Sequence, residues 1–170
     1  MLRVEHLDVF HGDAQALDDV SIEIGEGMIV AIVGANGAGK SSLIRTIAGI
    51  ERPSAGTIRF RGQDITGLPS YRICNLGIGQ VAEGRQIFPS LTVEENLEMG
   101  ALLPRARASM RETMREVEAM FPRLAERRGQ AAGTMSGGEQ QMLAIAQGPP
   151  DVVVREPAVI ESYLGAEAVD

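Results

Sequence analysis

The sequence predicts an α/β fold organised around a parallel β-sheet, and three observations support this prediction. Residues 28–33 form a continuous apolar and largely β-branched run, which is typical of a strand buried on both faces of a parallel sheet. A glycine-rich loop follows directly, and Leu43, Ile44 and Ile47 then recur at helical spacing. The chain has 170 residues, 44% of them apolar and 23% charged, which suits one globular domain with a buried core.

The loop after the predicted strand has the spacing of a phosphate-binding loop, GxxxxGK followed by serine. Glycines let successive backbone N–H groups surround a polyphosphate, and the next helix adds its positive dipole end. Lys40, the only lysine in the chain, is expected to reach the β- and γ-phosphates, and Ser41 to offer a hydroxyl ligand to Mg²⁺. A glycine-rich turn without a ligand is disfavoured, because the flanking strand and helix predictions are also present. The predicted phosphate-binding residues are Gly34, Ala35, Asn36, Gly37, Ala38, Gly39, Lys40, Ser41 and Ser42.

The flanking segments predict further strands, because apolar residues alternate with polar ones between turn signals. The expected strands cover residues 2–4, 7–9, 20–24, 57–60 and 76–81, and the expected turns cover residues 18–19, 25–27, 54–56 and 61–64.

Helices are expected in the second half of the chain. Thr92 and Glu95 form a capping box that opens a helix continuing to residue 102 or 103 and ended by Pro104. A later apolar stripe has helical spacing and is interpreted as core rather than as a docking face. Its members are Met110, Met114, Val117, Phe121 and Leu124.

A second informative motif covers residues 134–141. Ser136 and Glu139 alone form an ordinary capping box. Gly137 and Gly138, just inside that helix start, add bare N–H groups that can face an anion. Because a phosphate-binding loop lies upstream, the anion-binding interpretation is favoured over simple capping.

With both motifs in this order, the chain resembles the ATP-binding subunits of ABC transporters from Leu2 to about Ala146. The resemblance implies ATP and Mg²⁺ as ligands and an α/β nucleotide-binding domain with an N-terminal antiparallel β portion. It implies one domain over residues 1–170, with core parts at about 1–80 and 136–170 and a helical subdomain at about 84–135. The core parallel sheet is expected to be incomplete, because few residues follow the second motif.

The resemblance also implies roles for residues at the nucleotide. Ser136, Gly137 and Gly138 would contact the γ-phosphate held by a second ATP-binding subunit in a head-to-tail dimer, and Glu139 belongs to the same nucleotide-binding motif. His11 falls where such subunits place an aromatic residue against adenine. It would stack on the base, or else it is an ordinary surface histidine.

Residues 77–97 resemble the branch that serves branched-chain amino acid transporters. Most ABC subunits carry glutamine where this chain has Glu83, and Glu83-Gly84-Arg85 followed by Phe-Pro is characteristic of this branch. Glu83 would lie near the metal and the interface with the transmembrane permease subunits, or it is a surface turn residue before Gly84. The resemblance implies a role in importing branched-chain or related amino acids, at the cytoplasmic face of the plasma membrane.

The residues that hydrolyse ATP in this family are hard to place. The family uses an Asp for Mg²⁺, a Glu directly after it for the attacking water, and a later His. The only histidines here, His6 and His11, both precede the phosphate loop. The chain therefore lacks the switch histidine, and catalysis by it is in doubt.

Two alignments of the last residues compete. In this family the Asp and the Glu stand at the end of an apolar strand, and residues 151–157 resemble that strand. Glu156 is then a candidate catalytic carboxylate, and Arg155 takes the place of the metal ligand, where a guanidinium would repel Mg²⁺. Alternatively, residues 148–165 match the C-terminus of the branched-chain subunits after an internal deletion near Gln147. We favour the second alignment because it matches more positions. Residues 152–154 are expected to pair beside the strand that precedes the phosphate loop, and a position away from the sheet would leave only the C-terminal alignment.

Composition excludes other partners. Acidic residues outnumber basic ones 23 to 16, and the net charge of -7 argues against sequence-independent binding to nucleic acid or anionic lipid. The longest apolar run is far shorter than the ~20 residues that span a bilayer, so no membrane insertion is expected. Three alternatives stay open: a nucleotide-binding module without hydrolysis, a nonfunctional truncated product, and an ABC-type ATPase of DNA metabolism, which the charge and the match at residues 83–89 disfavour.

Overall fold

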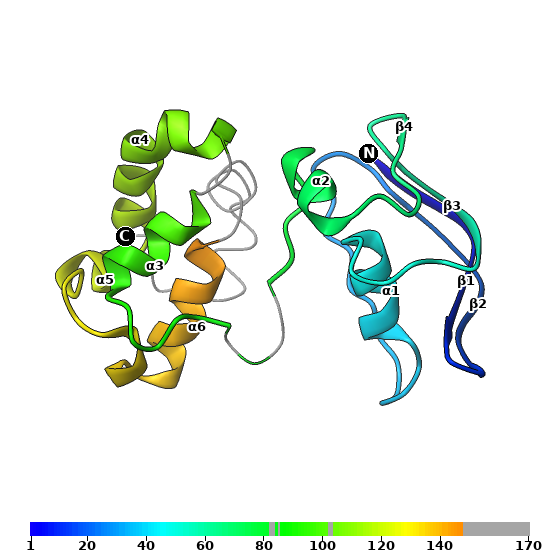
Figure 1. Ribbon diagram of the computed structural model, residues 1–170, viewed down its shortest axis with the longest axis horizontal. Coiled ribbons are helices and arrows are strands. Elements are labelled where there is room, and N and C mark those ends of the chain that lie inside the picture. Colours follow the sequence, from blue (N-terminus) through cyan, green and yellow to red (C-terminus); the bar gives the residue numbers. More distant parts are fainter. Residues whose placement is uncertain (82–83, 85, 102–103, 148–170) are drawn as a thin grey trace. The chain divides into compact units, whose positions relative to one another are not determined.

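The computed structural model describes residues 1–81, 84, 86–101 and 104–147 (Figure 1). The chain divides into two compact units, Met1–Leu76 and a second unit that begins at Gly77. None of the described helices is long and apolar enough to span a bilayer.

The first unit contains a four-stranded antiparallel sheet and two helices. Strands β1 (Leu2–His11), β2 (Ala14–Ile24), β3 (Ala55–Phe60) and β4 (Gln63–Asp64) lie in the order β2-β1-β3-β4. Helices α1 (Lys40–Ile47) and α2 (Ser70–Asn75) complete this unit. The antiparallel N-terminal portion implied by the resemblance is therefore present, and the alternation at residues 20–24 is confirmed within β2.

A bulge explains why the sequence suggested two strands where one exists. Val4, Leu7 and Val9 are each at most 1% exposed, yet Val4 and Leu7 are an odd number of residues apart and would lie on opposite faces of a regular strand. His6 adopts φ 51, and the pairing of β1 with β2 shifts register between Val4 and Leu7. The extra residue at the bulge returns all three side chains to the core face.

Several expected turns differ from the structure. Asp18 and Asp19 lie within β2 rather than in a turn. The turn expected over residues 61–64 is confined to Arg61 and Gly62, both with positive φ, because residues 63–64 pair with β3 as β4. The turn at residues 25–27 is confirmed and contains Gly27 at φ 67.

The strand predicted at residues 28–33 is wrong for the described structure. This segment has no strand assignment, and its apolar side chains are exposed, Ile29 at 64% and Val33 at 91%. A parallel strand gains burial only from strands on both sides and helices on both faces. All strand pairs among the described residues are antiparallel, and none includes residues 28–33.

The strand predicted at residues 76–81 is also wrong. Leu76 caps the end of α2, and Gly77 follows in a left-handed turn at φ 103. An extended apolar run needs a neighbouring strand to satisfy its backbone groups, and no described strand pairs with this segment.

The second unit is helical in its described part. It contains α3 (Val93–Gly100), α4 (Pro104–Met120), α5 (Pro122–Glu126), the 3₁₀ turn η1 (Ala132–Thr134) and α6 (Gly137–Ala146). The predicted capping box of Thr92 and Glu95 opens α3. The predicted end of that helix is wrong, because α3 stops at Gly100, and Pro104 begins α4, a position that suits a residue without an N–H.

The core of the second unit joins α3 to α6 and confirms the core interpretation for four of the five residues of the apolar stripe, Met110 being outside the buried cluster. Val117, Phe121 and Leu124 are at most 4% exposed, and Met114 packs against them. Leu143 of α6 is fully buried in the same cluster. The helix of the second motif is therefore anchored by burial of apolar side chains.

Candidate functional site

The predicted phosphate loop leads directly into α1 in the first unit. Gly37 and Gly39 adopt φ 85 and φ 81, which side chains rarely tolerate. A Cβ on Gly39 would lie 2.4 Å from the carbonyl oxygen of Ala16, whereas one on Gly37 would meet nothing within 4 Å. Gly39 is therefore required both by its backbone angle and by the close approach of the loop to β2.

Lys40 folds back across the loop. Its Nζ donates hydrogen bonds to the carbonyl oxygens of Gly34 and Ala35, each at 2.7 Å. The backbone N–H of Ala38 also donates to Ala35, at 3.2 Å. The ammonium thus lies against the loop, where an incoming polyphosphate would compete with two neutral carbonyls for it.

The start of α1 differs from the starts of α3 and α6. Both α3 and α6 begin with a complete capping box, whereas no side chain caps Gly39, and the first turn of α1 holds no acidic residue. The first N–H groups of a helix have no partner within it. Together with the positive end of the dipole, they give α1 the donor set that an anion needs.

These residues fit a polyphosphate, and they offer one hydroxyl for its metal. Ser41 lies exposed in the first turn of α1, directly after Lys40. Within the described ranges no group of three or more His, Cys, Asp or Glu residues could hold a metal ion. The Ser41 hydroxyl is a group that could add one protein ligand to a metal ion whose other ligands are phosphate oxygens.

His11, at the end of β1, is tied to α1. Its Nε2 lies 2.9 Å from Oγ of Ser42 and 3.5 Å from Oε2 of Glu51. Its side chain is half exposed, at 50%. Sequence reasoning found His11 but missed Glu51, because nothing local in the sequence indicates a contact between residues this far apart.

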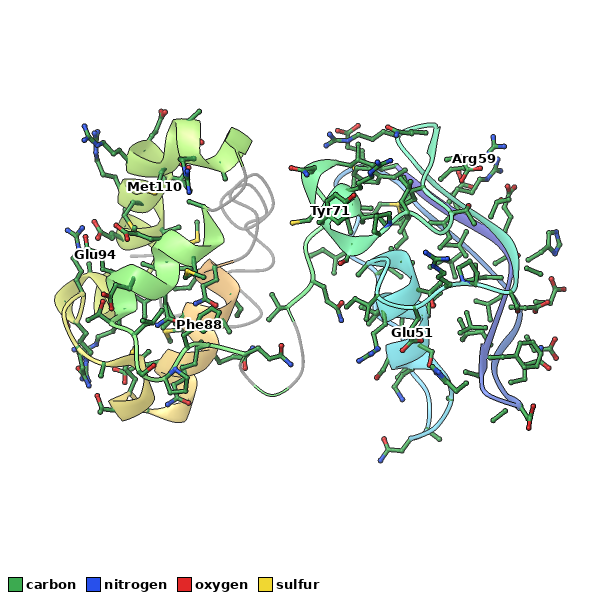
Figure 2. All side chains as sticks on the ribbon, viewed as in Figure 1. Glu51, Arg59, Tyr71, Phe88, Glu94 and Met110 are labelled. Carbon is green, nitrogen blue, oxygen red and sulfur yellow. The ribbon has the colours of Figure 1, made fainter. Side chains whose placement is uncertain are left out.

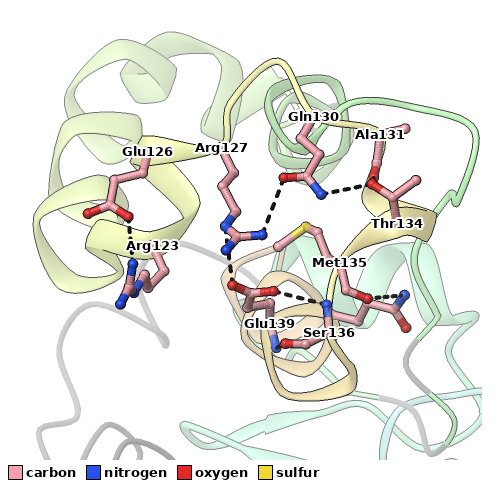
Figure 3. Close-up of polar contacts among 10 residues, drawn as sticks. Arg123, Glu126, Arg127, Gln130, Ala131, Thr134, Met135, Ser136 and Glu139 are labelled. Carbon is pink, nitrogen blue, oxygen red and sulfur yellow. Dashed lines mark hydrogen bonds and ion pairs between the residues drawn. The ribbon is translucent and has the colours of Figure 1, made fainter.

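The second motif forms the start of α6 in the second unit (Figure 3). The N–H of Glu139 donates to Oγ of Ser136 at 3.4 Å, and the N–H of Ser136 donates to Oε2 of Glu139 at 2.9 Å. This backbone hydrogen bond from Ser136, then the Ser136 hydroxyl and the nearby Arg127 guanidinium, lower the pKa of Glu139. Arg127 Nε lies 3.3 Å from Oε1 of Glu139, so this carboxylate is already engaged inside the unit.

The two glycines after Ser136, unlike Glu139, leave the start of α6 open. A Cβ on Gly138 would meet nothing within 4 Å. The N–H groups of Gly137 and Gly138 lie in the first turn of α6 and have no acceptor within the helix. Gln140 Nε2 holds the preceding segment by donating to the carbonyl oxygens of Ala132, Gly133 and Met135 at 3.2 to 3.4 Å. The helix start is thus fixed in place and open at its glycines.

Other predicted residues fall outside the described ranges. Glu83, Glu156 and the rest of residues 151–157 lie outside the described ranges, and so does the pairing expected for residues 152–154. The phosphate loop and His11 lie in the first unit, and Ser136 to Glu139 lie in the second.

Comparisons with known proteins identify the family to which the chain belongs. The family model described as ABC transporter matches residues 17–159. The high-affinity branched-chain amino acid transport ATP-binding protein BraG of Pseudomonas aeruginosa is 45% identical over 163 residues, covering 94% of this chain and 70% of BraG. The probable branched-chain amino acid transport ATP-binding protein LivF of Archaeoglobus fulgidus is 37% identical, covering 86% of this chain and 61% of LivF. The chain thus spans roughly two thirds of the length of these relatives.

Solved structures with the same fold include a nucleotide-free ATP-binding cassette from an ABC transporter. It superposes with a TM-score of 0.74 at 28% identity, covering 86% of this chain and 63% of that one. A dimeric cassette in a post-hydrolysis state bound to ADP and Pi has a TM-score of 0.68 at 25% identity, covering 92% and 71%. The family match, the relatives and the α/β fold lead to one conclusion: the chain belongs to the ATP-binding proteins of the ABC transporter family.

Proposed function

We propose that this chain binds Mg-ATP as the ATP-binding subunit of an importer for branched-chain or related amino acids, a role that couples ATP binding and hydrolysis to transport. The observation that carries the proposal is the uncapped start of α1, preceded by a glycine loop and followed by Lys40. The branched-chain transport proteins among its relatives support the substrate class.

Different residues of the first unit bind the phosphates, the metal ion and the base of Mg-ATP. Backbone N–H groups of residues 34–42 surround the phosphates, and Lys40 exchanges its two carbonyl contacts for phosphate oxygens. Ser41 contributes a hydroxyl ligand to Mg²⁺, which when bound neutralises phosphate charge. His11, at the end of β1, packs against the adenine ring.

The partners we propose are a second ATP-binding subunit and transmembrane permease subunits. Ser136, Gly137 and Gly138 contact the γ-phosphate held by the other subunit of a head-to-tail dimer, with Glu139 holding the turn. The open glycines at the start of α6 support this role, as does the dimeric cassette among the solved structures. Glu83 lies near the metal and the permease interface.

In this proposal the chain acts at the cytoplasmic face of the plasma membrane and does not insert into it. The domain organisation that accompanies it comprises core parts at about residues 1–80 and 136–170 and a helical subdomain at about residues 84–135. The described helices of the second unit support a helical part in that region.

A second candidate is a nucleotide-binding module that does not hydrolyse ATP. One observation favours it: His6 and His11 are the only histidines in this sequence, and both precede the phosphate loop. Such a chain would still pair with an intact subunit through its nucleotide.

Nucleotide titration tests the proposal. The wild-type chain should bind Mg-ATP, and its melting temperature should rise with Mg-ATP because the ligand binds only the folded state. Lys40→Ala should weaken binding by about 2 kcal/mol or more, because a charge-assisted phosphate contact is lost. Arg59→Ala removes an exposed cation from β3 of the same unit and serves as the control. Equal affinities for Mg-ATP in wild type and Lys40→Ala would refute the assignment.

A further inference from the structure

A polar network joins the end of β1 to α1 and to the segment after α1. His11 Nε2 contacts Ser42 in the first turn of α1 and faces Glu51. The other carboxylate oxygen of Glu51 accepts a hydrogen bond from Arg45 Nε at 2.5 Å. Ser42 and Arg45 are three residues apart on α1 and therefore lie on one face of it.

The backbone places Glu51 against this face. After α1 ends, the N–H groups of Ile50 and Glu51 both donate to the carbonyl oxygen of Arg45, at 2.9 and 3.3 Å. This turn brings Glu51 back along the helix (Figure 2). The side chain of Glu51 is only 17% exposed there. The position of the carboxylate is thus set by backbone hydrogen bonds as well as by Arg45.

One oxygen of this carboxylate lacks a hydrogen-bond donor, and among the described residues His11 is its ion-pair neighbour. Glu51 Oε2 is buried and makes no hydrogen bond to any described residue, and His11 Nε2 lies 3.5 Å away as its ion-pair neighbour. Leaving a buried carboxylate oxygen without a donor is costly. A carboxylate only accepts hydrogen bonds, so the ring nitrogen that faces it must carry the proton. Glu51 therefore favours the Nε2–H form of His11 and fixes the direction of the ring.

We propose that Glu51 is a positioning residue, which holds the His11 imidazole against the first turn of α1 so that the ring forms a preorganised wall for the base of the bound nucleotide. The inference rests on the proposed function, since it assumes that a nucleotide occupies the phosphate loop. Phosphate binding and base binding therefore depend on separate groups. Lys40 and the loop hold the phosphates, and Glu51 affects binding of the base by orienting His11.

Two ligands separate these contributions. Mg-ATP carries a base, whereas Mg-tripolyphosphate offers the phosphates alone. Glu51→Gln should weaken Mg-ATP binding about fivefold, as expected when one side chain must be ordered on binding, and should leave the affinity for Mg-tripolyphosphate within about twofold. Glu23→Gln is the matched control, because Glu23 is an exposed glutamate on β2 that pairs with Arg3. His11→Ala should reproduce the split, and adding Glu51→Gln to it should weaken Mg-ATP binding no further.

Nitrogen NMR at about pH 8 provides a readout that needs no nucleotide. The chain has two histidines, and His6 is a built-in reference, because its Nδ1 lies 2.6 Å from Oδ1 of Asp19. His11 should show the Nε2–H form and His6 the Nδ1–H form. Glu51→Gln should shift the ring signals of His11 and leave those of His6 unchanged.

The outcomes distinguish this proposal from the proposed function. If the wild-type chain does not bind Mg-ATP, the proposed function fails, and the NMR comparison still decides whether Glu51 orients His11. The proposal for Glu51 is overturned if Glu51→Gln binds Mg-ATP with unchanged affinity. It is also overturned if Glu51→Gln loses equal affinity for Mg-ATP and Mg-tripolyphosphate. If Glu51→Gln does not fold, His11→Ala decides: a loss confined to Mg-ATP supports the proposal, and any other result overturns it.

Discussion

Two residues of the β1–β2 hairpin adopt left-handed backbone conformations without being glycine. His6 has φ 51 and Asp19 has φ 50, and their side chains are joined at 2.6 Å. The N–H of His6 donates to Ser21 Oγ, and the N–H of Asp19 donates to Asp8 Oδ1. These side-chain acceptors satisfy N–H groups that the shifted register removes from the ladder, so the bulge is maintained by polar contacts on its exposed face.

The titration of His6 tests this cluster. The hydrogen bond and the charge of Asp19 raise the pKa of His6 above its ordinary value of 6.5. The stabilisation by the pair is fully present below the unfolded-state pKa and is lost as pH rises through the raised folded-state pKa. NMR titration should therefore give a higher pKa for His6 than for an unstructured peptide, and Asp19→Asn should lower it.

Asp18→Asn is the matched control for that titration, because Asp18 neighbours Asp19 in β2 and bonds to Gln15 instead of His6. Both members of the His6 pair are more than 70% exposed, and solvent screens such pairs strongly. The pKa is therefore a more sensitive readout than the melting temperature. A His6 pKa that is equally affected by the two substitutions would contradict the assigned contact.

At the scale of elements, the sequence predicts a helix start well when the signal is local. Both capping boxes involve residues three positions apart, and both are found at α3 and α6. The glycine loop before α1 is equally local, because its backbone angles depend on the residue types at those positions. The end of α3 was mispredicted, since Pro104 is compatible with starting a helix as well as with ending one.

The loop before α3 depends on one buried amide that the sequence did not single out. Asn96 is fully buried. Its Oδ1 accepts from the N–H of Phe88 and from Gln147 Nε2, each at 2.8 Å. Its Nδ2 donates to the carbonyl oxygens of Phe88 and Thr92 at 3.0 and 2.8 Å. A single side chain therefore satisfies the polar backbone of the loop and joins α3 to the end of α6.

Asn96→Ala should lower the free energy of unfolding by ~2–3 kcal/mol, because several buried polar groups lose their partner. Asn75→Ala, at an exposed position ending α2, should change it by less than about 0.5 kcal/mol. Chemical denaturation of the two variants and the wild type provides the measurement. If both variants lose the same free energy of unfolding, the hydrogen bonds of Asn96 do not stabilise the fold.

At the scale of the whole molecule, prediction from sequence was weakest where burial depends on distant segments. Residues 28–33 have the composition of a strand covered on both faces, yet composition does not supply the neighbours. In the described structure these residues remain exposed beside an entirely antiparallel sheet. The phosphate loop nevertheless forms, because its contacts are with itself, with α1 and with β2. The candidate binding site was therefore predictable, whereas the parallel core was not.

Whether this 170-residue chain hydrolyses ATP is a property of the whole molecule, because turnover needs a metal ligand and a water-orienting group in addition to the phosphate loop. Lys40 and Ser41 serve binding, and fixing the geometry of Mg²⁺ requires further oxygen ligands. Each missing electrostatic contribution removes a large share of the barrier reduction. The second candidate, a nucleotide-binding module without hydrolysis, predicts that phosphate release from Mg-ATP equals the background of Lys40→Ala, although the wild-type chain binds the nucleotide. Glu156→Gln provides the opposing test. Mg²⁺-dependent phosphate release that is abolished by both Lys40→Ala and Glu156→Gln would show that residues 151–157 supply the catalytic carboxylate. That result would favour the alignment in which residues 151–157 replace the family's strand.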